Sequence, residues 1–176
     1  LWILPMAIII KNNIGAGKFD EFEFTKYVQR WFISLYANGE VEEDIEGKMT
    51  ISLKISAACL NEDIEKLKEM MVTVATEARW QNRQKIEIIV NQSKFVIGKL
   101  MVESMDTINA TRSGCLLNKD TAIHEALGGL IGLNKFLNFL NEKTVDEIAD
   151  TCELLYKQIL TNGKIRGYVS CSEDMK

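Results

Sequence analysis

The residues best suited to chemistry are a histidine–glutamate pair and a cysteine that comes shortly before it. His124, the only histidine of the chain, is followed by Glu125, and Cys115 precedes them. A zinc hydrolase needs at least three protein ligands, and this pair belongs to neither an H-x-x-E-H nor an H-E-x-x-H pattern. A cysteine nucleophile needs a base beside it, and a predicted helix start separates Cys115 from His124. We therefore predict no catalytic residue and no metal ligand here.

Two other segments carry residues that proteins use to bind ligands, and both lack the required spacing. Gly15-Ala16-Gly17 has no preceding strand, third glycine or Lys-Ser/Thr pair, so we expect a simple turn and not a phosphate loop. The acidic run lacks the D-x-D-x-D-G spacing of a calcium loop and is predicted to be a solvated connection; its members are Glu40, Glu42, Glu43, Asp44 and Glu46. We expect no cofactor in this chain.

The sulfur-containing residues are predicted to fill space. No two of the four cysteines stand at C-x-x-C spacing, and Cys152 falls on the apolar side of a helix, where we expect a small buried hydrophobe. Free thiols favour a reducing compartment. The methionines at helical spacing are expected to be core residues; they are Met70, Met71, Met101 and Met105.

Composition narrows the class of protein. The chain has 176 residues, 47% hydrophobic and 26% charged, as in ordinary globular domains. A net charge of −4, with Lys and Arg dispersed, argues against a nucleic-acid partner. The apolar stretch 1–10 is too short to span a bilayer, and Pro5 suits the first turn of a buried helix. Because the chain opens abruptly without Met, we expect a fragment of a longer protein.

The histidine–glutamate pair lies in a segment with the spacing of one long helix, 118–140. Apolar residues recur there every three or four positions, and Asn118 suits the cap. Gly128, Gly129 and Gly132 each cost such a helix about 1 kcal/mol relative to Ala. We expect this cost to be offset by the close approach of another backbone.

The other elements follow from similar patterns. Helices are predicted over 5–13, from a cap at Asp20 to Trp31, from a cap at Asn61 to Arg79, over 82–112, and from the capping box Thr144–Glu147 to Gly163. Strands are predicted over 31–36, 49–59 and 165–171, the first two joined as a long hairpin with a turn that begins at Asn38-Gly39. We predict one α+β domain over 1–176, in which helices cover one face of an antiparallel sheet in two layers.

This order of elements, with its short motifs, resembles an internal domain of the pitrilysin/insulysin-type zinc metallopeptidases, in the presequence-protease and falcilysin branch. The matching segments are Leu4-Pro5-Met6, Ile14-Gly15-Ala16-Gly17, the helix containing Tyr27, the hairpin, Leu53-Lys54-Ile55-Ser56, Asn61-Glu62-Asp63-Ile64, His124 to Leu130 and Phe136-Leu137. The chain departs from the family at Trp31-Phe32-Ile33-Ser34, where T-G-G-I-S is common.

The resemblance implies a non-catalytic third domain, so no zinc-binding or catalytic residue carries over. The parent enzyme would hold the zinc, and this domain would help to confine a peptide substrate beside the remainder of the protease, with strand 50–59 as a candidate to line the chamber. An organelle such as a mitochondrion or plastid would be the expected compartment. From the residues alone, a stand-alone interaction or scaffold domain without enzymatic activity is the alternative.

Overall fold

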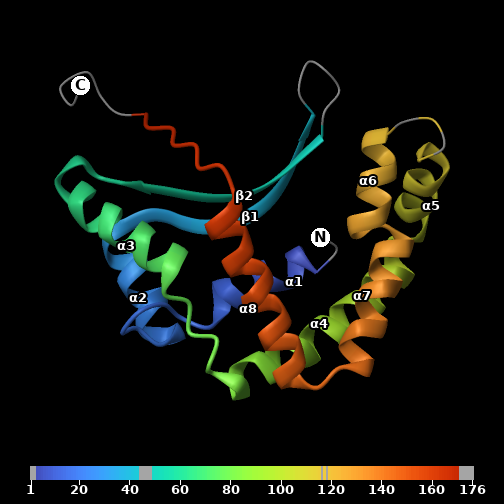
Figure 1. Ribbon diagram of the computed structural model, residues 1–176, viewed down its shortest axis with the longest axis horizontal. Coiled ribbons are helices and arrows are strands. Elements are labelled where there is room, and N and C mark those ends of the chain that lie inside the picture. Colours follow the sequence, from blue (N-terminus) through green and yellow to red (C-terminus); the bar gives the residue numbers. More distant parts are fainter. Residues whose placement is uncertain (1–2, 44–48, 116, 118, 171–176) are drawn as a thin grey trace.

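Figure 1 shows the computed structural model of the chain, which describes residues 3–43, 49–115, 117 and 119–170. The elements in chain order are α1 (Leu4–Asn13), α2 (Glu21–Trp31), β1 (Phe32–Glu43), β2 (Met49–Cys59), the short 3-10 helix η1 (Asn61–Asp63), α3 (Ile64–Thr76), α4 (Arg83–Glu103), α5 (Met105–Gly114), α6 (Lys119–Gly128), α7 (Leu130–Glu142) and α8 (Val145–Asn162).

The sheet is a long antiparallel hairpin of β1 and β2. Ala37 faces Ile55 and Gly39 faces Leu53 in its register. The hydrophobic side chains of these rows pack against α1, α2 and α3, which lie along the hairpin in Figure 1. On the opposite face Glu40 and Lys54 form an ion pair at 3.0 Å. The fold is α+β, as predicted.

Two clusters of buried side chains hold the elements together. The larger joins α1 to α4, α7 and α8, with Trp80 in the segment before α4. The smaller lies under the hairpin, where Phe32, Met70 and Val74 meet the aromatic residues of α2. The α5 and α6 helices pack on each other, and in Figure 1 they extend from α4 and α7 toward the same side as the tip of the hairpin.

The predicted turn at Asn38-Gly39 is wrong, because β1 continues through both residues to Glu43. Gly39 has another function. A Cβ atom there would lie 3.2 Å from Ile8 Cδ1, so the absent side chain lets α1 pack closely on β1. The acidic run therefore begins inside the strand. Asp44 and Glu46 lie outside the described residues.

Two predicted helices are each interrupted. The 82–112 helix is interrupted at Ser104, which has φ −107° and ψ 22° and lies between α4 and α5. The 118–140 helix breaks at Gly129, whose extended backbone (ψ −169°) precedes α7. The cap predicted at Asn118 lies outside the described residues. Asn61 begins η1, so α3 starts only at Ile64.

The predicted last strand is also wrong over its described part, 165–170, which has no regular secondary structure. Ile165, Tyr168 and Val169 are at least 85% exposed. β-branched and aromatic residues of this kind favour a strand, but sheet formation also requires a neighbouring strand with unpaired backbone groups. No other described segment pairs with this part of the chain.

Candidate functional site

The histidine–glutamate pair lies at the α6–α7 junction, and its two members are placed differently. His124 is exposed on α6, whereas Glu125 is only 2% exposed. The Glu125 carboxylate accepts a hydrogen bond from the Ile131 N–H at 3.2 Å and so satisfies one free amide at the start of α7. Glu125 therefore acts as a cap of α7 that is supplied by the preceding helix.

Gly129 explains how a carboxylate fits at this junction. A Cβ atom at Gly129 would lie 2.6 Å from Glu125 Cδ and 2.7 Å from its Cα, so only glycine leaves the space that Glu125 occupies. The prediction that glycine here allows the close approach of another backbone is wrong at Gly129. The group that approaches is a side chain from the preceding turn, and it approaches where the helix breaks.

Cys115 follows α5, where its Sγ lies 2.8 Å from the carbonyl oxygen of Arg112. The α5 and α6 helices pack closely, since a Cβ atom at Gly114 would lie 3.1 Å from Thr121 Cγ2. Within the described residues, no three His, Cys, Asp or Glu side chains are placed to hold a metal ion.

Gly15-Ala16-Gly17 forms a turn that is bound to the chain after α3. Gly15 and Gly17 have positive φ angles of 80° and 55°. The Gly17 N–H donates to Glu77 O at 2.8 Å, and Gly15 O accepts from the Arg79 N–H at 3.4 Å. These backbone groups are engaged within the protein, which confirms the turn and is unlike a phosphate loop, whose N–H groups face the ligand.

The sulfur-containing residues are mostly, but not wholly, in the core. Cys152 is fully buried, and burial raises the pKa of its thiol to about 12, as befits a small hydrophobe. Met70 is 5% exposed and Met101 packs against the larger cluster. Met105 is 48% exposed, so its prediction as a core residue is wrong.

Sequence reasoning missed an exposed apolar stripe on α4, which we call the α4 outer stripe: Ile88, Phe95 and Val102. These side chains are 50%, 74% and 75% exposed. They stand seven residues apart, so they share one side of the helix, opposite the buried Ile86. The sequence already showed this stripe, because its three apolar residues repeat every seven positions apart from the buried ones. Exposed apolar patches mark surfaces that bind other proteins.

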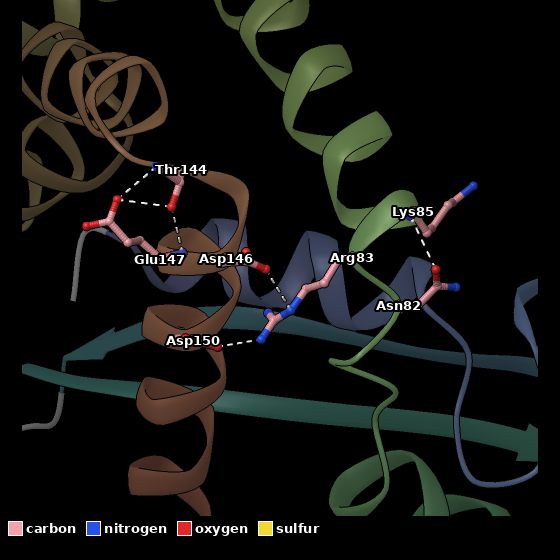
Figure 2. Close-up of polar contacts among 7 residues, drawn as sticks. All are labelled: Asn82, Arg83, Lys85, Thr144, Asp146, Glu147 and Asp150. Atoms are coloured by element: carbon pink, nitrogen blue, oxygen red, sulfur yellow. Dashed lines mark hydrogen bonds and ion pairs between the residues drawn. The ribbon is translucent and has the colours of Figure 1, made fainter.

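Polar contacts fix α4 at its beginning, as Figure 2 shows. The Asn82 side chain accepts from the Lys85 N–H at 3.3 Å. The Arg83 guanidinium reaches Asp146 at 3.3 Å and Asp150 at 2.5 Å, both on α8. Lys85 also pairs with Glu21 of α2 at 2.5 Å. The α4 outer stripe thus lies on a helix that is joined to α2 and α8.

Two comparisons bear on the kind of protein this is. The model of a protein family described as associated with the peptidases of family M16, subfamily C, matches residues 13–142, about three quarters of the chain. No curated protein matches the sequence. No helix among the described residues is both long enough and apolar enough to cross a membrane.

Proposed function

The chain belongs to the family of domains associated with subfamily C of the M16 peptidases, and from this premise we propose that it is a non-catalytic domain of a zinc metalloendopeptidase. In this proposal another part of the protein holds the zinc and cleaves the peptide. The present domain helps to confine the peptide while it is cleaved. The family match over 13–142 is the observation that carries the proposal.

The chemistry of the candidate residues supports a non-catalytic role. Glu125, the carboxylate next to the histidine, is already engaged as a cap of α7. Cys152 is a buried thiol whose pKa is raised to about 12, so it is a poor nucleophile at neutral pH. A domain of this kind contributes to catalysis by positioning the substrate, which lowers the entropic part of the barrier.

The arrangement of the elements supports confinement. In Figure 1 the hairpin and the α5–α6 pair extend to the same side of the layer formed by α1, α4 and α8. The hairpin face away from the helices carries polar side chains, among them Asn38, Lys54 and Ser56. Polar groups on an open sheet face suit contact with water or with the backbone of an unfolded peptide.

The remainder of the peptidase is the partner that we propose for the α4 outer stripe. Fully burying an aromatic or large aliphatic side chain is worth about 1.5–3 kcal/mol, so covering Ile88, Phe95 and Val102 would stabilise the contact with the peptidase. The family description, which associates such domains with a peptidase, supplies the partner. The ion pairs of Arg83 and Lys85 hold the helix in place for that contact.

The experiment compares the purified 176-residue chain with the intact product of its gene. We expect the chain alone to retain no stoichiometric zinc after gel filtration and to cleave no unstructured peptide. The intact product should bind zinc and cleave the same peptide. Stoichiometric zinc in the chain alone would contradict the proposal, as would an intact product that lacks an H-x-x-E-H motif and peptidase activity; the latter result would favour the scaffold alternative.

A pair of variants in the intact product tests the α4 outer stripe. Phe95→Ser should loosen the contact between the domain and the peptidase, and we expect peptide cleavage to fall several-fold with zinc content unchanged. Phe22→Ser is the matched control, because Phe22 is a 66% exposed aromatic residue on another helix, α2. Equal effects of the two variants would show that the stripe is not the contact.

A further inference from the structure

Lys11, in the last turn of α1, is a buried cation with no function assigned so far. The residue is 5% exposed and shares the side of the helix that carries Leu4 and Ala7. It lines a cavity of about 130 Å³. Ala16, Leu35 and Val74 form part of the apolar wall. Asn12 and Tyr36 also line the cavity and are exposed, so the cavity lies at the protein surface.

No described residue forms an ion pair or a hydrogen bond with the Lys11 ammonium group. Burial without a counter-ion is unfavourable for a charge, and it lowers the pKa of Lys11 from 10.5 to about 8. At neutral pH most Lys11 side chains therefore still carry a proton. The result is a positive charge beside an open cavity, with nothing described that neutralises it.

We propose that Lys11 and this cavity form a binding site for a carboxylate group. A cavity of about 130 Å³ holds several water molecules or one such group. An ion pair formed against an apolar wall is stronger than one in water, because the wall excludes solvent from the charges. Lys11 is the only charged side chain that lines the cavity among the described residues.

The surroundings favour a singly charged anion over a phosphate. Lys11 lies at the C-terminal end of α1, where free backbone carbonyl groups give a partial negative charge. Phosphate sites instead use helix N-termini, clustered N–H groups or arginine. One of the two N–H groups of the Asn12 amide donates to Ala37 O at 2.8 Å, so the amide offers an anion one neutral donor at most. One ammonium group can neutralise one carboxylate and no more.

The carboxylate would come from a peptide, either from its C-terminus or from an acidic side chain. This choice of carrier rests on the proposed function, whereas the affinity for a carboxylate rests only on Lys11 and its cavity. The two can therefore fail separately. The test begins with acetate, which needs no peptide, and continues with peptides that carry the carboxylate in one position or the other.

The 176-residue chain is titrated with sodium acetate, and with sodium chloride at equal ionic strength, while NMR follows the backbone amides of Asn12, Gly15 and Ala16. We expect saturable shifts with acetate and none with chloride. Lys11→Met and Lys11→Gln should weaken the acetate response at least about tenfold, because both remove the charge. Lys18→Met, which removes an exposed lysine nearby, should leave it unchanged.

A response that never saturates, that persists in both Lys11 variants, or that phosphate produces more strongly than acetate would overturn the carboxylate site. Three capped peptides then identify the carrier: one with a free C-terminus, one amidated with an internal Glu, and one amidated with Gln. Binding of either of the first two, but not of the third, supports a peptide carboxylate. Acetate binding without any peptide binding upholds the site and counts against the proposed peptide confinement.

Discussion

The starts of α7 and α8 show two ways in which a carboxylate can satisfy free helix amides. At α8, Glu147 accepts from the Thr144 N–H at 2.9 Å, and Thr144 Oγ1 accepts from the Glu147 N–H at 3.2 Å, on the protein surface. At α7, Glu125 reaches across from α6 to the Ile131 N–H and is 2% exposed. Both are hydrogen bonds from a backbone N–H to a glutamate carboxylate. The one at α8 is exposed to solvent, whereas the carboxylate at α7 is buried.

The difference determines what each junction tolerates. The α8 start depends on four consecutive residues, and water can replace a lost partner there. The α7 start depends on a space that only a glycine leaves, and one oxygen of Glu125, Oε2, is buried without a hydrogen-bond partner among the described residues. Because a buried polar group has no water to replace its partner, changes at α7 should cost more than changes at α8.

The largest effect is expected from Gly129→Ala. The new Cβ atom would lie 2.7 Å from the Cα of Glu125, so the backbone at the junction must shift and the cap must move. We expect a loss of about 2–4 kcal/mol in the free energy of unfolding, measured by urea denaturation. This would establish that the α7 start depends on the space that Gly129 leaves for Glu125.

Gly98→Ala provides the control. Gly98 lies within α4, and a Cβ atom there would meet nothing within 4 Å. Alanine has the higher helix propensity, so this variant should gain up to about 1 kcal/mol. Equal losses in the two variants would show that the Glu125 contact is not the cause. A cycle with Glu125→Ala should recover part of the Gly129→Ala loss if the two groups compete for one space.

The next largest effect is expected at Lys11, the second buried charge. Lys11→Met keeps an unbranched side chain and removes the cost of burying a charge, so the variant should be more stable than wild type at pH 7. The gain is up to about 3 kcal/mol, because the pKa of Lys11 is about 8 in the folded chain and 10.5 without burial. Between pH 8 and 10.5 the folded wild-type chain loses its proton before the unfolded chain does. The wild-type chain therefore gains stability as the pH rises, and the difference shrinks.

Urea denaturation of the wild-type chain and of Lys11→Met, from about pH 7 to about pH 10, measures how their difference in stability changes with pH. Lys18→Met serves as the control, because Lys18 is exposed and should give a difference independent of pH. A difference between Lys11→Met and wild type that stays constant or grows with pH would contradict the burial of a charged lysine.

Local signals allowed much of the fold to be predicted. The cap at Asp20 and the capping box at Thr144 placed the starts of α2 and α8 correctly. The alternation around Leu53 and Ile55 identified β2 and its inward face. These features depend on residues a few positions apart, which the sequence displays directly.

Features set by tertiary contacts were not predicted. One such feature is the close packing of α1 on Gly39 within β1, because the two segments are distant in the sequence. The break at Gly129 was missed for another reason: Glu125 is only four residues away, but the apolar periodicity does not show where its side chain reaches. Lys11 was read as part of an apolar helix because its neighbours are apolar. Its position on the buried side, in line with Leu4 and Ala7, was the available signal.

A smaller effect is expected at the exposed junction. Thr144→Ala removes the side-chain acceptor for the Glu147 N–H, and we expect a loss of about 1 kcal/mol, clearly less than for Gly129→Ala. Thr144→Ser is the matched control because serine can accept the same hydrogen bond. Thermal unfolding followed by circular dichroism measures both. A loss as large as that of Gly129→Ala would remove the proposed difference between the two junctions.

The smallest effect is the dependence of the α8 start on pH. The hydrogen bond from the Thr144 N–H, with those from Lys143 and Thr144 Oγ1, lowers the pKa of Glu147 below its usual value. The stabilisation is therefore present above the pKa of the unfolded state, about 4.3, and is lost as the pH falls through the lower folded value. Glu147→Gln keeps an acceptor but not the charge, so its difference from wild type should shrink as the pH falls below about 4.3. A difference that instead persists unchanged at about pH 3 would show that the charge of Glu147 does not stabilise this exposed junction.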